Sequence, residues 1–210
     1  MLYCSLRHIF LIEGDKKTPD EVEDEKVIEY KKKIKQIDEY KGIVAERFIE
    51  LLMMKWAGEE VDGYHYFNTD EKVLLPRFNW TKGKRLSLPG SREVQIDIIG
   101  KKELLAWFVE SKYWIGKKAG LGEVKEFEEK CQIAGQALEI EKAICWFFSK
   151  EGFTKETEEY MKEKGILYSD QDSLNKLLTK FGIRKLLDMV GSRSLSDKGL
   201  KKGCLVAYLR

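Results

Sequence analysis

The sequence predicts an α/β fold in which a central sheet is covered by helices on both faces. Short apolar segments with the spacing of strands alternate with longer segments of helical periodicity, which is the pattern of such layered folds. The segment 143–149 is almost wholly apolar, as in a strand that is buried on both faces. Hydrophobic residues make up 43% of the 210 residues, which is sufficient for an extensive core.

The expected elements follow from these periodicities. The apolar N-terminal segment predicts a strand rather than a signal peptide, because Arg7 and His8 interrupt it and no cleavage site follows. Gly42 then separates a charged helix from a more apolar one. In chain order we expect strand 1–14, helices 20–41 and 43–56, a loop-rich stretch 61–92, strands 93–99 and 104–113, helix 123–140, strand 143–149, helix 153–164, strand 166–168 and helix 172–181.

The two N-terminal helices share a heptad-like apolar spacing. We interpret this spacing as two successive helices that pack on their own domain. An intermolecular coiled coil is the alternative, although Gly42 would interrupt a continuous one. The apolar positions are 27, 30, 34, 37, 44, 48 and 51.

Composition narrows the classes of protein. The net charge is only +2, so any nucleic-acid-binding surface has to be a local patch. No apolar run approaches the length that spans a bilayer, so no membrane partner is expected. The four cysteines contain no CxxC pair, which disfavours structural zinc, and a reduced intracellular protein is the default. Abundant Lys and Glu with scarce amides are typical of thermophile proteins, although a Lys/Glu-rich mesophile chain looks the same.

The feature richest in chemistry is a pair of strands that carry charged residues in apolar surroundings. Asp97 interrupts an isoleucine-rich stretch, and Glu110 and Lys112 end the next apolar stretch. Charged residues are depleted in strands, so their presence here requires a reason. Because side chains alternate along a strand, Glu110 and Lys112 share a face and Ser111 points to the other.

The turn between the two strands decides whether Asp97 joins this face. The sequence Gly-Lys-Lys-Glu at 100–103 predicts the turn, and an even-length loop places Asp97 on the face of Glu110. The loop length alone still leaves Asp97 several residues from Glu110, so the register or a bulge has to close that gap.

Two carboxylates beside a lysine suit metal-assisted phosphodiester hydrolysis. A pair of carboxylates binds a hard divalent cation, which polarises a phosphoryl oxygen and lowers the pKa of a bound water. A lysine can orient or deprotonate that water, or offset charge on the phosphate. Only two histidines are present, so a metal site has to be built from carboxylates, which favours Mg²⁺ or Mn²⁺.

These residues resemble a known family. Asp97, twelve intervening residues and then Glu110-x-Lys112 resemble the motif of the PD-(D/E)xK nuclease superfamily, although Ile96 stands where the family name implies proline. The stretch 40–48 resembles the family's first helix, and Glu46 matches its acidic residue. The downstream elements are similar to those of Mrr-like members and of nuclease domains found with archaeal ATPases.

The resemblance implies both a fold and an activity. It covers residues 40–182 and implies a restriction-endonuclease-like α/β/α core with a central mixed sheet, preceded by a strand and charged helix at 1–39 and followed by an extension of unknown role at 183–210. The implied activity is that of a Mg²⁺- or Mn²⁺-dependent deoxyribonuclease, an endonuclease that cuts DNA. The implied catalytic residues are Asp97, Glu110, Lys112 and Glu46, and the implied metal ligands are Asp97, Glu110 and the backbone carbonyl of Ser111.

Basic residues near the motif are candidates for contacts to the DNA backbone. They are Lys84 and Arg85 before the first strand of the pair, and Lys117 and Lys118 after the second. Tyr113 and Trp114 could stack on bases, or pack in the core.

Two other functions are compatible with the same residues. One is a structure-specific, Holliday-junction-type resolvase that works as a homodimer, and another is a non-cleaving nucleic-acid-binding module associated with an ATPase. The chain has no GxxxxGK[ST] loop, so it is not itself a P-loop ATPase.

Overall fold

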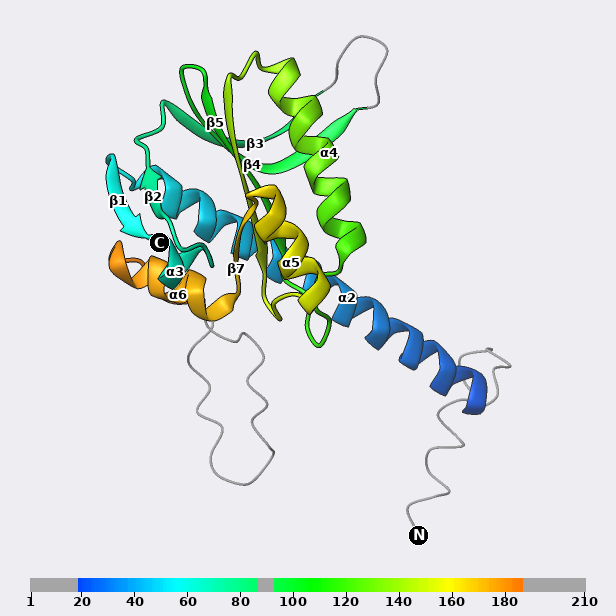
Figure 1. The fold of residues 1–210 in the computed structure, drawn as a ribbon. Helices are drawn as coiled ribbons and strands as arrows, with labels where there is room; N and C mark the ends of the chain where they lie inside the picture. The colour runs from blue at the N-terminus through cyan, green and yellow to red at the C-terminus, as the bar shows by residue number, and fades with distance from the viewer. Residues whose placement is uncertain (1–18, 87–92, 187–210) are drawn as a thin grey trace.

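The computed structural model describes residues 19–86 and 93–186, which form a mixed α/β structure around a five-stranded sheet (Figure 1). The strand order is β3-β4-β5-β6-β7, in which β3, β4 and β5 are antiparallel neighbours and β6 and β7 continue parallel to β5. The elements are α2 (Pro19–Met54), β1 (Glu59–Asp62), α3 (Gly63–Tyr66), β2 (Lys72–Leu75), β3 (Trp80–Leu86), β4 (Val94–Lys102), β5 (Leu105–Lys112), α4 (Leu121–Ala137), β6 (Lys142–Ser149), α5 (Lys155–Lys164), β7 (Leu167–Ser169) and α6 (Gln171–Lys180).

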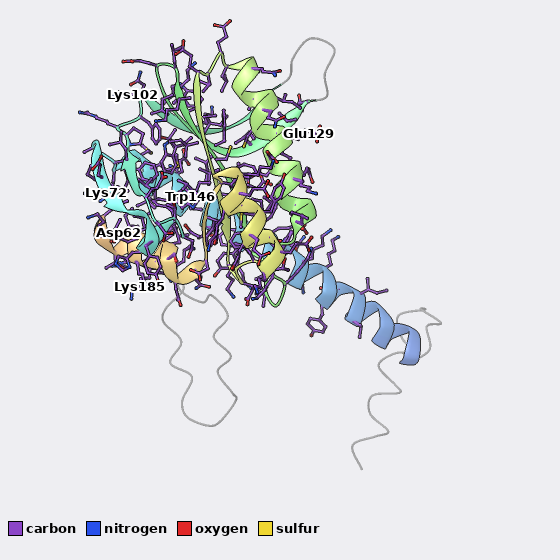
Figure 2. All side chains as sticks on the ribbon, viewed as in Figure 1. Asp62, Lys72, Lys102, Glu129, Trp146 and Lys185 are labelled. Carbon is purple, nitrogen blue, oxygen red and sulfur yellow. The ribbon has the colours of Figure 1, made fainter. Side chains whose placement is uncertain are left out.

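Helices cover both faces of the sheet, as the sequence predicts (Figure 1). On one face α4 and α5 bury an apolar core in which Phe127 packs edge-on against Phe147. On the other face α2 and α6, together with the β1–β2 hairpin, enclose a core around Trp56, Trp107 and Trp146. Figure 2 shows Trp146 inside the body, with the side chain of Lys102 at its periphery.

Two predictions about the N-terminal half are wrong. Gly42 does not end a helix, because α2 runs without a break from Pro19 to Met54. A glycine costs a helix only about 1 kcal/mol, and burial of Ala45, Ile49 and Leu52 on the sheet outweighs that cost. The described part of the loop-rich stretch, residues 61–86, also holds more regular structure than expected, since it contains the second half of β1, α3, β2 and the edge strand β3.

The turn between β4 and β5 is not at 100–103 but at Glu103–Leu104, because the two strands pair as far as Lys102 and Leu105. Gly100 instead lies within β4, where a β-carbon would come within 2.6 Å of the ring of Phe78 and 2.8 Å of Met53. This glycine therefore serves close packing, and the left-handed turn conformation is taken by Glu103 with φ of 54°.

The second half of the chain follows the sequence prediction closely. Helices α5 and α6 begin and end within two residues of the predicted bounds, and the carboxylate of Asp170, the N-cap residue of α6, accepts from the amide of Ser173. The strand expected at 143–149 is β6, although only its second half is buried. No helix in the described ranges is long and apolar enough to cross a membrane. The expected strand 1–14 and residues 187–210 of the extension lie outside those ranges.

Candidate active site

Asp97 lies at a bulge in β4. Ile96 and Ile99 are three positions apart on β4, whereas their partners on β3, Lys84 and Lys82, are two positions apart. One extra residue is therefore accommodated on β4 around Asp97. A bulge of this kind bends the strand and re-aims a side chain.

The bulge coincides with the point where β4 and β5 separate. Their pairing ends at Ile98 and Val109, and the next residues along the two strands are Asp97 and Glu110. The amide nitrogen of Ser111 donates to Oδ2 of Asp97 over 2.9 Å, so a side-chain oxygen takes the place of a backbone acceptor. The two-residue turn sets a strand register in which Asp97 and Glu110 are neighbours. The turn expected at 100–103 would have left them several residues apart.

Glu110 is a buried carboxylate with two lysines on one of its oxygens. The residue is only 3% exposed. Its Oε1 accepts from Nζ of Lys112 over 2.6 Å and from Nζ of Lys130 over 3.4 Å. Its Oε2 is also buried and has no hydrogen-bond partner among the residues that the structure describes. Half of this carboxylate is therefore still available to a ligand.

Lys130 of α4 is a further member of the site, which was not predicted from the sequence. Its ammonium also lies 3.1 Å from the carboxylate of Glu126, one helical turn earlier. Burial alone would lower the pKa of Lys130, but the charges of Glu110 and Glu126 outweigh it and raise the pKa. The signal was present in the sequence, because Lys130 falls between Phe127 and Ala134 on the helical face that packs on the sheet.

Glu46 brings a third carboxylate to the site from α2. Burial raises its pKa to about 7, and the charges of Asp97 and Glu110 act in the same direction. Burial, followed by the charge of Glu110, likewise raises the pKa of Asp97 to about 6, although the Ser111 amide and the lysines oppose the shift. Because the pKa values of these carboxyl groups are raised, the site is stabilised by binding protons or a cation.

The donor set fits a hard divalent cation. Asp97 and Glu110 offer carboxylate oxygens at the point where β4 and β5 separate, which we call the strand fork. The amide of Lys150 donates to the carbonyl of Lys112 on the β6 side, so by strand alternation the amide and carbonyl of Ser111 face β4, beside Asp97. Within the described ranges, no group of three or more His, Cys, Asp and Glu side chains is arranged to hold a metal ion. The ligand set expected from the sequence has two carboxylates and one backbone carbonyl.

The candidate DNA-contacting lysines lie in the loop after β5. Nζ of Lys117 lies 4.0 Å from the ring centre of Trp114 and 2.9 Å from the carboxylate of Glu123, while Lys118 is exposed. Lys84 and Arg85 belong to β3, but their side chains lie outside the described part of the structure.

Two aromatic residues follow Lys112. Tyr113 is buried, as its core interpretation expects. Trp114 is only partly buried, and the ammonium groups of Lys112 and Lys117 lie 5.8 Å and 4.0 Å from the centre of its ring. Of this pair, Trp114 is therefore the residue that a base could reach.

Few known proteins are similar to this chain in sequence or in structure. No protein-family model matches the chain, and no curated protein is significantly similar to it in sequence. A structural comparison matches part of the chain to the crystal structure of a protein of unknown function, AF1548, with 18% identity and a TM-score of 0.41. The match covers 49% of this chain and 57% of that one, so it spans little more than half of the AF1548 chain.

Proposed function

We propose that this chain is a metal-dependent nuclease of the PD-(D/E)xK type that hydrolyses phosphodiester bonds in DNA. The observation that carries the proposal is the strand fork, where Asp97 lies next to Glu110 and the ammonium of Lys112 bonds to Glu110. The sheet order supports a restriction-endonuclease-like core, since an antiparallel β3–β4–β5 unit is followed by β6 and β7 parallel to β5, with helices on both faces.

A divalent cation would be held by Asp97, by Glu110 and by the backbone carbonyl of Ser111. Oε2 of Glu110 is the oxygen that such a cation would contact, because it is buried and has no hydrogen-bond partner among the described residues. When bound, Mg²⁺ or Mn²⁺ supplies positive charge to a phosphoryl oxygen and makes a water molecule more acidic.

The chain's own side chains have separate tasks in this proposal. Lys112 is partly exposed, so its ammonium can reach from Glu110 towards a bound phosphate and offset its charge. Lys130, which belongs to α4, contacts the same oxygen of Glu110 as Lys112 does and orients this carboxylate. Glu46, with its raised pKa, is suited to accept a proton near neutral pH.

Cleavage of labelled DNA tests the proposal. Single-stranded, duplex and junction DNA are incubated with the protein in Mg²⁺, Mn²⁺ or EDTA. We expect cleavage of at least one form that requires the metal, and a loss of roughly 10²–10⁴-fold in Lys112→Ala.

Lys102→Ala is the matched control, because Lys102 is an exposed lysine at the turn end of β4, away from the fork. It should cut DNA like the wild type. Absence of cleavage of every form in both metals, or equal activity in Lys112→Ala, would remove the basis for a nuclease with this site.

A further inference from the structure

The N-terminal half of α2 carries large apolar side chains that its own domain does not cover. Ile28 and Tyr30 are each 64% exposed, Ile37 is 52% exposed and Val27 is 43% exposed. Figure 1 shows this half of the helix extending away from the sheet and from the helices that cover it. The interpretation that the whole heptad-like stripe packs on its own domain is therefore wrong for this half.

The uncovered residues belong to a heptad-like stripe that continues along the helix. Val27 falls on the heptad position of Phe48, which packs against the core, whereas Tyr30 and Ile37 fall on that of Leu51, which is 40% exposed. The domain therefore covers this stripe in part, at Phe48, and leaves it uncovered at Val27, Tyr30 and Ile37. An apolar helical stripe of this kind is typical of a surface that pairs with another helix.

Charge along the same half of α2 indicates what that partner is. Residues 20–25 include five acidic residues, and residues 31–35 include four lysines. A second copy aligned in parallel would place lysines against lysines and acids against acids. An antiparallel copy, centred near Ile28, would place the acidic segment of each chain against the basic segment of the other.

We infer that α2 mediates self-association, in which two copies of the chain pair their N-terminal helix halves in an antiparallel manner. Two of the lysines also make pairs within their own helix, Lys33 with Glu29 at 2.6 Å and Lys35 with Glu39 at 3.8 Å. Such exposed pairs contribute little, so they leave the lysines able to interact across the interface as well.

This arrangement keeps the two candidate active sites apart and open. An overlap of residues 20–36 is about 25 Å long at 1.5 Å per residue. Glu46 lies beyond this overlap, towards the C-terminal end of the helix, so the two α/β bodies would stand at opposite ends of the paired helices. The inference does not depend on the proposed nuclease activity.

Charge reversal tests both the partner and the direction of pairing. Light scattering and sedimentation would measure the mass of the full chain over a range of concentrations at low salt. One variant changes Lys31, Lys32, Lys33 and Lys35 to Glu, and the other changes Asp20, Glu21, Glu23, Asp24 and Glu25 to Lys. We expect a wild-type dimer, at least about tenfold weaker dimerisation of each variant alone, and recovery of a dimer when the two variants are mixed.

A control variant changes four exposed lysines on other helices to Glu: Lys155, Lys162, Lys176 and Lys180. This variant should dimerise like the wild type. Circular dichroism checks that each variant folds. We expect that each does, because this half of the helix is not covered by its own domain. A monomeric wild type at all concentrations, a dimer that neither reversal weakens, or a mixture that stays monomeric would overturn the inference.

Discussion

The backbone carbonyl of Asp97 lies so close to Gly83 on the neighbouring strand that a β-carbon at Gly83 would overlap with it. This contact occurs where β4 has its extra residue. The bulge that turns the Asp97 side chain towards Glu110 therefore depends on a glycine that has no chemistry of its own. Removing that space should disturb the site without touching any charged group.

Gly83→Ala should destabilise the protein by about 1–3 kcal/mol, because the added methyl group has to displace the backbone of β4. It should also reduce cleavage, since the Asp97 carboxylate moves with its backbone. Gly42→Ala is the matched control, as nothing lies within 4 Å of its β-carbon position in the middle of α2. It should stabilise by up to about 1 kcal/mol. Thermal unfolding of both variants checks this, and equal melting temperatures would argue against the strained contact.

Lys130→Met should reduce cleavage by about 10- to 100-fold while leaving the fold intact. The charge of Lys130 lowers the pKa of Asp97, so Asp97 should ionise less readily in the variant and the acid limb of the pH–rate profile should move to higher pH. Glu126→Gln is the control, because it removes the other partner of Lys130 and leaves the Glu110 contact. An unchanged rate and pH profile in Lys130→Met would mean that Lys130 only packs against the sheet.

Stability without metal should fall as pH rises from about 4 to about 7. In this range an unfolded chain has already lost the protons of Asp97 and Glu46, while the folded chain still holds them because their pKa values are raised to about 6 and about 7. Mn²⁺ should reverse the trend, since it binds the ionised carboxylates, and should raise the melting temperature more at pH 7.5 than at pH 5. The measurement is thermal unfolding in EDTA and in Mn²⁺, compared with Asp97→Asn. The same pH dependence in both proteins would show that Asp97 is not responsible.

DNA binding should depend on local charge and not on sequence. The net charge is only +2, so phosphate contacts have to come from clustered residues such as Lys117 and Lys118. Affinity measured by fluorescence anisotropy in Ca²⁺ should fall steeply with salt and be similar for unrelated sequences of one shape. Lys118→Ala should reduce the salt slope by about 1. A strong preference for one sequence would point to dedicated base readout and contradict this expectation.

Much of the sheet could be predicted from local patterns. The strands β4, β5, β6 and β7 and the helices after them follow from alternation and helical periodicity in a few neighbouring residues. Asp97, Glu110 and Lys112 could be selected for the same reason, because charged residues in apolar strands stand out within a short window.

The rest depended on contacts between distant segments. Gly100 predicts a turn locally, yet it lies within a strand because Phe78 and Met53 pack against it. Gly42 predicts a helix end locally, yet packing of its neighbours on the sheet carries the helix through. The bulge at Asp97 involves β3, whose sequence predicts a loop rather than a strand. Lys130 enters the site only through the position of α4.

The proposed function requires a metal site at Asp97, and isothermal titration of Mn²⁺ in the absence of DNA tests this requirement most directly. The wild type should bind Mn²⁺ at neutral pH. Asp97→Asn, which keeps the shape of the side chain, should bind at least about tenfold more weakly. Glu126→Gln, which changes the other carboxylate in contact with Lys130, should bind like the wild type. Equal Mn²⁺ affinity in the wild type and in Asp97→Asn would contradict the proposed site.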